Sequence, residues 1–479
     1  MAIRLPVVFL GGFPIFPSEG IHMNGTATIL SSALLAGLAS ATFTIADESG
    51  RAALTFSDAV GVQRTISTSS IDVDNAFFQD LGTNGRSCST CHQADQGWTV
   101  TPDRIRERFE STQGLDPIFR ANDGSNCEGA DVSSLSKRRT AYSQLLDKGL
   151  IRIGIQVLPG AEFTIENVDD PYQCGAPLTD ASMYRRPLPS TNLGFLSTVM
   201  WDGRETVKGQ SIRADLESQA NDATVGHAQG QPLPNVLIKE IVDFELALST
   251  AQTQLQGVGS LTANGARGGP VALSQQPFCI GVNDPLNILP VMPGACSTSS
   301  GGLDPNVFTL FGVWADDVAQ RRSISRGEAI FNTRTFQIDN VGGLNRDAGD
   351  PIAGAFTGTC TVCHDTPNAG NHSISMPLDI GLTDPSRRTP DLPLYLLRNK
   401  ATQATIATTD PGRAMVTGKW TDIGKFKGPV LRALAARAPY FHNGSAGTLE
   451  DAIDFYDTRF HIGLTASEKA DLIAFLSAL

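Results

Sequence analysis

The feature that most constrains this chain is a five-residue pattern, C-x-x-C-H, that occurs once in each half of the sequence. Its residues are Cys88, Cys91 and His92 in the first copy, and Cys360, Cys363 and His364 in the second. Two thiols about one helical turn apart can form thioethers with the two vinyl groups on one edge of a porphyrin. The histidine that follows can then bind the iron. The pattern therefore predicts two covalently attached c-type haems in one polypeptide.

The same cysteines permit a second interpretation, a zinc ion bound by four thiolates. Two C-x-x-C pairs that share one zinc ion usually lie about 15–20 residues apart. Here more than half of the chain separates the two pairs, and each pair carries its own histidine. The spacing favours two haems over one zinc site.

Four further cysteines remain, at positions 127, 174, 279 and 296. An even remainder is typical of disulfides in an exported protein. Proximity along the chain favours pairing Cys127 with Cys174 and Cys279 with Cys296, although four cysteines allow three pairings. Haem attachment and disulfides both require an oxidising compartment outside the cytoplasm. We therefore expect the protein in the periplasm.

Residues 1–46 have the features of an export signal. One apolar stretch covers residues 5–16 and a second covers residues 29–43. Signal peptidase accepts small residues such as Ala39-Ser40-Ala41, so we expect cleavage near this point. The second stretch is interrupted by serine and glycine and is short for a membrane span. The sequence therefore predicts a signal peptide and a mature form without a membrane span.

The remainder of the chain divides into three parts by composition and motif position. Residues 47–256 are expected to form an N-terminal cytochrome c-like domain, and residues 306–479 a C-terminal one. Residues 257–305 are rich in Gly, Pro, Ser and Asn and indicate a linker or a long surface excursion. Apolar residues recur at helical spacing in residues 236–248, and residues 465–468 form a capping box before a closing helix. Strand-like alternation is scarce, so we expect a mainly α fold of two haem domains with long loops and little β structure.

The charge of the chain limits its partners. The formal net charge is −12, and no long basic run occurs. Nucleic acid and anionic membrane surfaces are therefore poor candidates for binding. An acidic surface would suit a basic redox protein, but it serves solubility equally well.

Several segments of the chain resemble one known family. They are Phe426–Arg432 (FKGPVLR), Ala438–Gly444 (APYFHNG), Thr448–Ala452 (TLEDA), Trp201–Arg204 (WDGR) and the pair Gln219-Ala220. The first three are similar to the C-terminal domain of the bacterial di-haem cytochrome c peroxidases, a family that includes MauG. The last two are similar to the tryptophan-bearing segment of the N-terminal domain. The resemblance spans most of the mature chain.

This resemblance implies a division of labour between the two haems. The haem on His92 would react with hydrogen peroxide, and the haem on His364 would take in or store electrons. Trp201 would relay charge between them. Reduction of peroxide to water needs two electrons, and one ferric haem passing to ferryl supplies one, so a second haem within tunnelling range meets the need.

The resemblance also implies a calcium ion near the domain interface. The backbone carbonyls of Arg437 and Pro439 match two of the family's calcium ligands. The side chain of Asn192 is a third candidate.

The family's axial methionine position on the second haem falls at Tyr456. A phenolate ligand would lower the reduction potential of the iron and favour its oxidised states. The second haem would then store oxidising equivalents. The alternative is that Tyr456 only packs its ring while Met376 or Met415 binds the iron.

The distal side of the first haem departs from the family pattern. The position of the usual distal glutamate holds Gln229, which cannot shuttle a proton. His227, two residues earlier, could serve as the distal base or as a removable sixth ligand. Equally, His227 could be a hydrogen-bonded surface residue. We expect His442 to anchor haem propionates and Trp98 to pack in the first haem pocket.

Together these patterns predict a periplasmic di-haem oxidoreductase that reduces hydrogen peroxide with electrons from a small redox protein. Two alternatives stay open. Gln229 favours a non-catalytic di-haem electron-transfer cytochrome. Tyr456 favours a MauG-like enzyme that oxidises side chains of a protein substrate.

Overall fold

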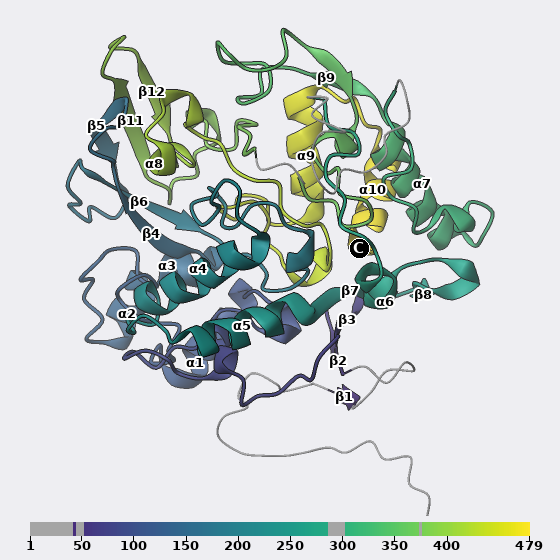
Figure 1. Cartoon of the computed structure of the whole chain (residues 1–479), viewed down its shortest axis with the longest axis horizontal. Coiled ribbons are helices and arrows are strands. Elements are labelled where there is room, and N and C mark those ends of the chain that lie inside the picture. The colour runs from purple at the N-terminus through teal and green to yellow at the C-terminus, as the bar shows by residue number, and fades with distance from the viewer. Residues whose placement is uncertain (1–41, 45–51, 286–301, 373–375) are drawn as a thin grey trace, which may run out of the picture.

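The computed structural model of this chain describes residues 42–44, 52–285, 302–372 and 376–479 (Figure 1). Nearly all of the predicted signal peptide lies outside the described residues. Helices make up 32% of the structure and strands 17%, with several sheets, so the prediction of a mainly α fold is wrong. No described helix has both the length and the apolar character needed to cross a membrane.

Ten α-helices lie in the described part of the chain, and several begin at residues that the sequence marks as caps. They are α1 Pro102–Thr112, α2 Leu135–Ala141, α3 Ser143–Lys148, α4 Ile212–Gly226, α5 Asn235–Ala247, α6 Gly269–Ser274, α7 Ala319–Thr333, α8 Ala414–Thr417, α9 Leu449–Phe460 and α10 Ala466–Ser477. Thr448 and Thr465 form capping boxes that start α9 and α10, because each hydroxyl accepts the N–H of the residue three positions on. The helices predicted within residues 236–248 and after residue 465 are confirmed as α5 and α10.

The strands of the described residues form four sheets, and most are shorter than eight residues. They are β1 Thr42–Thr44, β2 Ala53–Ser57, β3 Gly61–Ser67, β4 Ile151–Gln156, β5 Phe163–Asp169, β6 Asp180–Arg185, β7 Leu248–Leu255, β8 Gly259–Ser260, β9 Phe336–Ile338, β10 Phe356–Gly358, β11 Leu394–Asn399 and β12 Thr405–Thr408. The largest sheet has the order β1-β2-β3-β7-β8. Its β3 and β7 are antiparallel neighbours although almost 200 residues separate them, so local sequence periodicity could not reveal the pairing.

One sheet joins the two halves of the chain. Strand β5 of the first half pairs antiparallel with β11 of the second half, which also pairs with β12 (Figure 1). Phe163 of β5 and Leu397 of β11 are both fully buried in the hydrophobic core beneath this sheet. The two halves therefore share a sheet and a core, while the boundaries of the two predicted haem domains stay a prediction.

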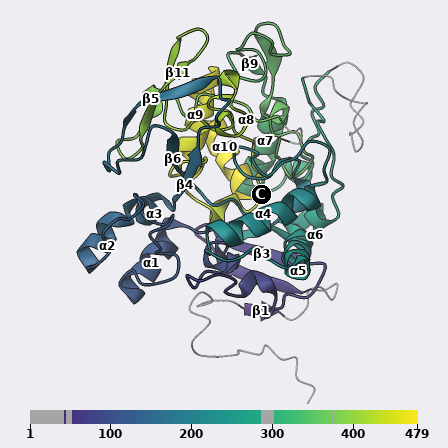
Figure 2. The ribbon, with the colours of Figure 1, turned by 60° about the vertical axis from the view of Figure 1, so that its left-hand side comes forward.

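Helices α1, α2 and α3 lie together on one side of the molecule (Figure 2). Beside them a disulfide links Cys127 to Cys174, with 5.2 Å between their Cα atoms. This predicted pairing is confirmed. Cys296 lies outside the described residues, so its pairing with Cys279 stays a prediction.

Candidate functional site

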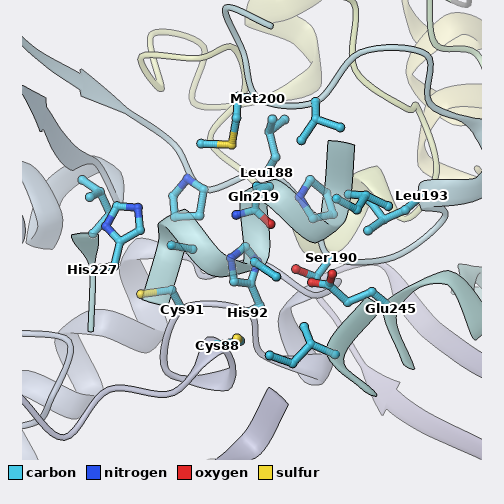
Figure 3. A pocket seen from close by; sticks show the side chains of 18 of the residues that line it. Cys88, Cys91, His92, Leu188, Ser190, Leu193, Met200, Gln219, His227 and Glu245 are labelled. Atoms are coloured by element: carbon cyan, nitrogen blue, oxygen red, sulfur yellow. The ribbon is translucent and has the colours of Figure 1, made fainter. Parts of the chain in front are cut away.

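The first C-x-x-C-H motif lies on the wall of a large cavity (Figure 3). A short 3-10 helix, Cys88–Thr90, presents the two thiols, and the N–H of His92 closes the turn on the carbonyl of Cys88 at 3.0 Å. Neither Cys88 nor Cys91 is in a disulfide. The empty volume of the cavity, its open mouth included, is about 1510 Å³.

The ring of His92 is oriented as a metal ligand would need. Its Nδ1 lies 3.1 Å from the carbonyl oxygen of Trp98, and burial lowers the pKa of His92 to about 4, so the imidazole is neutral. A hydrogen bond from Nδ1–H to a carbonyl assigns the other nitrogen, Nε2, to a metal. The first motif therefore has both the thiols and the imidazole that a c-type haem requires.

The second motif repeats this arrangement in a second cavity. The 3-10 helix Cys360–Val362 presents the thiols, and Cys360, Cys363 and His364 all line the cavity. The Nδ1 of His364 lies 2.6 Å from the carbonyl oxygen of Gly370, and burial lowers the pKa of His364 to about 4. In both pockets the carbonyl that orients the histidine comes from the sixth residue after it.

Tyr456 of α9 lines the second cavity together with His364. The two ring centroids are 6.4 Å apart, and the ring planes meet at 76°. Burial, with the neighbouring thiols, raises the pKa of the Tyr456 hydroxyl, so a phenolate here requires a compensating cation. Of the two alternative ligands, Met415 is buried in the separate core beneath β5 and β11, and Met376 is not among the described residues that line the second cavity. The structure thus brings Tyr456 to His364 and places Met415 elsewhere.

Trp201 lies between the two cavities and lines both of them. Its Nε1–H donates to the carbonyl of Arg186 at 2.8 Å, which fixes the plane of the indole. On the side of the second cavity its ring centroid is 6.2 Å from that of His442. The sequence prediction that Trp201 relays charge is consistent with this position.

Three buried cations surround the same junction: Arg186, Lys427 and Arg437. Their hydrogen bonds reach backbone carbonyls, such as the bond from Lys427 Nζ to Thr198 at 2.9 Å, and no carboxylate in the described part of the chain pairs with them. Burial lowers the pKa of Lys427 to about 7 and that of Arg186 to about 9. Buried cations require counter-ions. The propionates of two haems are suitable counter-ions, so these residues fit the cofactor.

His227 lies on the wall of the first cavity, just after α4 (Figure 3). Its Nδ1 is 2.5 Å from Oδ2 of Asp123, and the guanidinium of Arg86 binds the other oxygen of that carboxylate. Although burial raises the pKa of Asp123, the bonds from His227 and Arg86 outweigh it and hold the pKa below its ordinary value. Asp123 therefore orients His227 and leaves Nε2 as the nitrogen that can exchange a proton.

The structure places Gln229 at the surface and not in the cavity. The chain leaves α4 at Gly226, and Gln229 has a left-handed backbone with φ of 54° and an exposed side chain. Gln219, which lies within α4 and ten residues before Gln229, lines the cavity instead (Figure 3). The catalytic assignment of Gln229 is therefore corrected, because the turn after α4 directs its side chain outward.

The sequence patterns predict no functional role for Gln219 or Asp123. Gln219 stands out in the sequence only as part of the Gln219-Ala220 pair that resembles the family. Asp123 is 104 residues from His227, and no local signal connects them.

Two of the three candidate calcium ligands, Asn192 and Arg437, form hydrogen bonds within the protein. The side-chain amide of Asn192 pairs in both directions with the backbone of Thr250, at 2.9 and 3.0 Å. The carbonyl of Arg437 accepts a bond from Arg186 at 3.2 Å, and Pro439 follows a cis peptide bond. Within the described ranges, no cluster of three His, Cys, Asp or Glu side chains could hold a metal ion. Calcium binding stays a prediction.

Comparisons with known proteins are consistent with this geometry. No protein-family model matches the chain. The chain is 34% identical over 140 residues to cytochrome-c peroxidase IdrP2 of Denitromonas iodatirespirans, a match that covers 26% of this chain and 37% of the relative. A match to IdrP1 of Pseudomonas sp. (strain SCT) is also 34% identical and covers 25% and 36% of the two chains. This chain is related to the cytochrome c peroxidases.

A third cytochrome c peroxidase matches over a similar length of the chain. Cytochrome c551 peroxidase of Nitrosomonas europaea is 31% identical over 121 residues, which are 25% of this chain and 30% of that protein. The chain thus matches between 30% and 37% of the length of these cytochrome c peroxidases. A crystal structure of a MauG-like protein associated with microbial copper homeostasis is 17% identical, with a TM-score of 0.38 over 85% of this chain and 86% of that one.

Proposed function

We propose that this cytochrome c peroxidase relative carries two covalently attached c-type haems and reduces hydrogen peroxide to water in the periplasm. The observation that carries the proposal is the position of Trp201, which lines both of the cavities that contain a C-x-x-C-H motif. When bound, each haem supplies an iron that exchanges one electron at a time. Two such pockets joined by one indole suit a two-electron reduction.

The first pocket is the proposed peroxide site. His227 lines this pocket and has the hydrogen-bond partner of a general acid-base group, because Asp123 holds its Nδ1 and leaves Nε2 as the nitrogen that can exchange a proton. It would take a proton from one peroxide oxygen and return it to the other. The amide of Gln219 would orient the peroxide by hydrogen bonding, since an amide can donate and accept but cannot shuttle a proton.

The second pocket is the proposed electron store. Tyr456 faces the motif there, and a phenolate ligand stabilises oxidised iron. Electrons would enter from a small redox protein, and Trp201 would pass them towards the first pocket. Lys427 and Arg186 line both cavities, where they would hold the propionates close to the indole.

The test is rapid mixing of the purified protein with hydrogen peroxide after intact mass has shown the number of haems. We expect two haems per chain, a peroxide-dependent change in the spectrum of the first haem, and a slower electron exchange between haems in Trp201→Phe. Trp420→Phe is the matched control, because Trp420 belongs to the core beneath β5 and β11. Two low-spin haems that ignore peroxide would instead support the non-catalytic electron-transfer alternative.

Tyr456 also supports a second candidate, oxidation of side chains in a protein substrate. A low-potential second haem would hold oxidising equivalents long enough for a partner to dock. This candidate predicts that peroxide-treated protein keeps its oxidised spectrum for minutes without a reductant. Decay within milliseconds would favour the peroxidase alone.

A further inference from the structure

We propose that Trp98 is a second redox-active tryptophan, which gives one electron to the first haem pocket and releases its indole proton along three buried threonine hydroxyls. This inference rests on the proposed reaction with peroxide. It adds a donor on the His92 side of the pocket, apart from Trp201 at the junction.

Trp98 is coupled closely to His92. It is fully buried, and its carbonyl oxygen accepts the Nδ1–H bond that orients His92, at 3.1 Å. Its ring lies 5.9 Å from Phe77 and 5.6 Å from Phe244, and the ring of Phe77 lies 6.5 Å from that of His92. The backbone of Trp98 is therefore hydrogen-bonded to His92, and its indole is linked to the imidazole through the ring of Phe77.

A chain of hydroxyls leads from the indole to the cavity wall. Trp98 Nε1–H donates to Oγ1 of Thr65 at 2.9 Å. Oγ1 of Thr65 is 2.8 Å from Oγ1 of Thr250, which is 2.9 Å from Oγ1 of Thr191. All three threonines are buried, and Thr191 lines the first cavity. Thr65 and Thr250 face each other across β3 and β7, so the sheet holds the chain in place.

The row of three threonine hydroxyls is longer than the indole N–H needs for its own hydrogen bond. One acceptor satisfies an indole N–H, and a hydroxyl can accept one proton while it donates another. A buried radical cation would be costly in an apolar core, so loss of an electron from Trp98 requires loss of the Nε1 proton. The threonines provide a route for that proton which a carbonyl acceptor could not.

The step balances as the loss of one electron and one proton. Trp98 gives one electron to the haem of the first pocket. The Nε1 proton passes to Thr65, whose hydroxyl proton moves to Thr250, then from Thr250 to Thr191, and from Thr191 to the cavity. There, reduction of one peroxide to two waters consumes two electrons and two protons, of which Trp98 supplies one each. The neutral indolyl radical regains an electron from the redox donor and a proton along the same route.

The second half of the chain contains a tryptophan that is as buried as Trp98 but whose indole N–H bonds a backbone carbonyl and not a hydroxyl. Trp314 is also fully buried and stacks on Phe311 with 5.1 Å between ring centroids. Its Nε1–H donates to the carbonyl of Ala263 at 2.9 Å. A backbone carbonyl has no proton to pass on, so Trp314 serves as the control.

The experiment uses the di-haem protein with the substitution Trp201→Phe, which confines the second oxidising equivalent to the first pocket. The oxidised protein is mixed with hydrogen peroxide, frozen within milliseconds and examined by electron paramagnetic resonance, with ring-deuterated tryptophan to identify an indole radical. We expect a tryptophan radical that Trp314→Phe retains and Trp98→Phe loses. Thr65→Val should lower its yield by about tenfold, the scale expected when a buried donor loses its acceptor.

Each outcome decides the proposal. Equal radical yields with and without Trp98 would overturn it, as would an unchanged yield in Thr65→Val. A first haem that responds optically to peroxide without any tryptophan radical would overturn this inference alone. No optical response to peroxide would overturn the proposed function as well. If Trp98→Phe fails to retain haem, Thr65→Val, which keeps the indole, gives the decision.

Discussion

The two pockets share one attachment geometry and differ in what faces it. Each holds a C-x-x-C-H turn on a 3-10 helix and a histidine whose Nδ1 bonds a carbonyl six residues on. In the first pocket the further polar groups include His227, held by Asp123, and Gln219 from α4. In the second pocket the facing residue is Tyr456 from α9. The motif therefore provides the same local geometry in both pockets, whereas the elements packed around it supply different polar groups.

Removal of the acid-base group of the first pocket should have the largest effect. His227→Ala should lower the rate of reaction with peroxide by about 10²–10⁴-fold, the usual range for a general acid-base residue. Stopped-flow mixing measures the rate. Gln229→Ala is the control and should react normally, because the structure places Gln229 at the surface. Equal losses in the two variants would contradict the assignment.

A second difference is a buried carboxyl in the first pocket. Burial raises the pKa of Glu245 to about 7, although a bond from Ser190 opposes this. The folded state therefore binds the proton more tightly than the unfolded chain between pH 4.5 and 7, and this carboxyl lowers stability as pH rises through that window. Glu245→Gln should be more stable than the wild type by roughly 3 kcal/mol above pH 7.

Guanidinium unfolding of the di-haem protein at a series of pH values measures this effect. Below pH 4.5 both proteins carry a neutral group at position 245, so their unfolding free energies should agree there. A difference between them that does not vary with pH would show that Glu245 stays ionised in the folded protein.

The role of Tyr456 as an iron ligand in the second pocket is tested by substitution. Tyr456→Met should raise the potential of the second haem by roughly 0.1 V or more, because a thioether favours the reduced iron that a phenolate disfavours. Spectroelectrochemical titration measures the potential. Tyr440→Phe is the matched control, since Tyr440 lines the same pocket but donates its hydroxyl to the carbonyl of Leu434. No difference between the variants would leave Tyr456 as a packing residue.

The smallest expected effect concerns the orientation of His227. Asp123→Asn keeps the size of the side chain but removes the charge that holds Nδ1–H, so the peroxide rate should fall by about tenfold. In a His227→Ala background, Asp123→Asn should lower the rate little further, because the two residues act as one hydrogen-bonded pair. Additive losses would mean that Asp123 acts through Arg86 and not through His227.

Local chemistry explains what could be read from the sequence. The C-x-x-C-H motifs predict their cofactor because thioether and iron bonds need residues within one short turn. The Cys127–Cys174 disulfide and helices α5 and α10 also follow from short-range patterns, and the structure confirms them. The expectation of little β structure failed because strands such as β5 and β11 are short and pair across more than 200 residues.

The sequence predicts the two haem attachment motifs, favours the Cys127–Cys174 pairing and shows the similarity to cytochrome c peroxidases. Only the tertiary structure decided that Gln229 faces outward, that Asp123 holds His227 and that three threonines from two strands and a loop line up behind Trp98. The physical reason is that hydrogen bonds form between neighbours in space. Side chains more than 100 residues apart become neighbours only when sheets and helices pack.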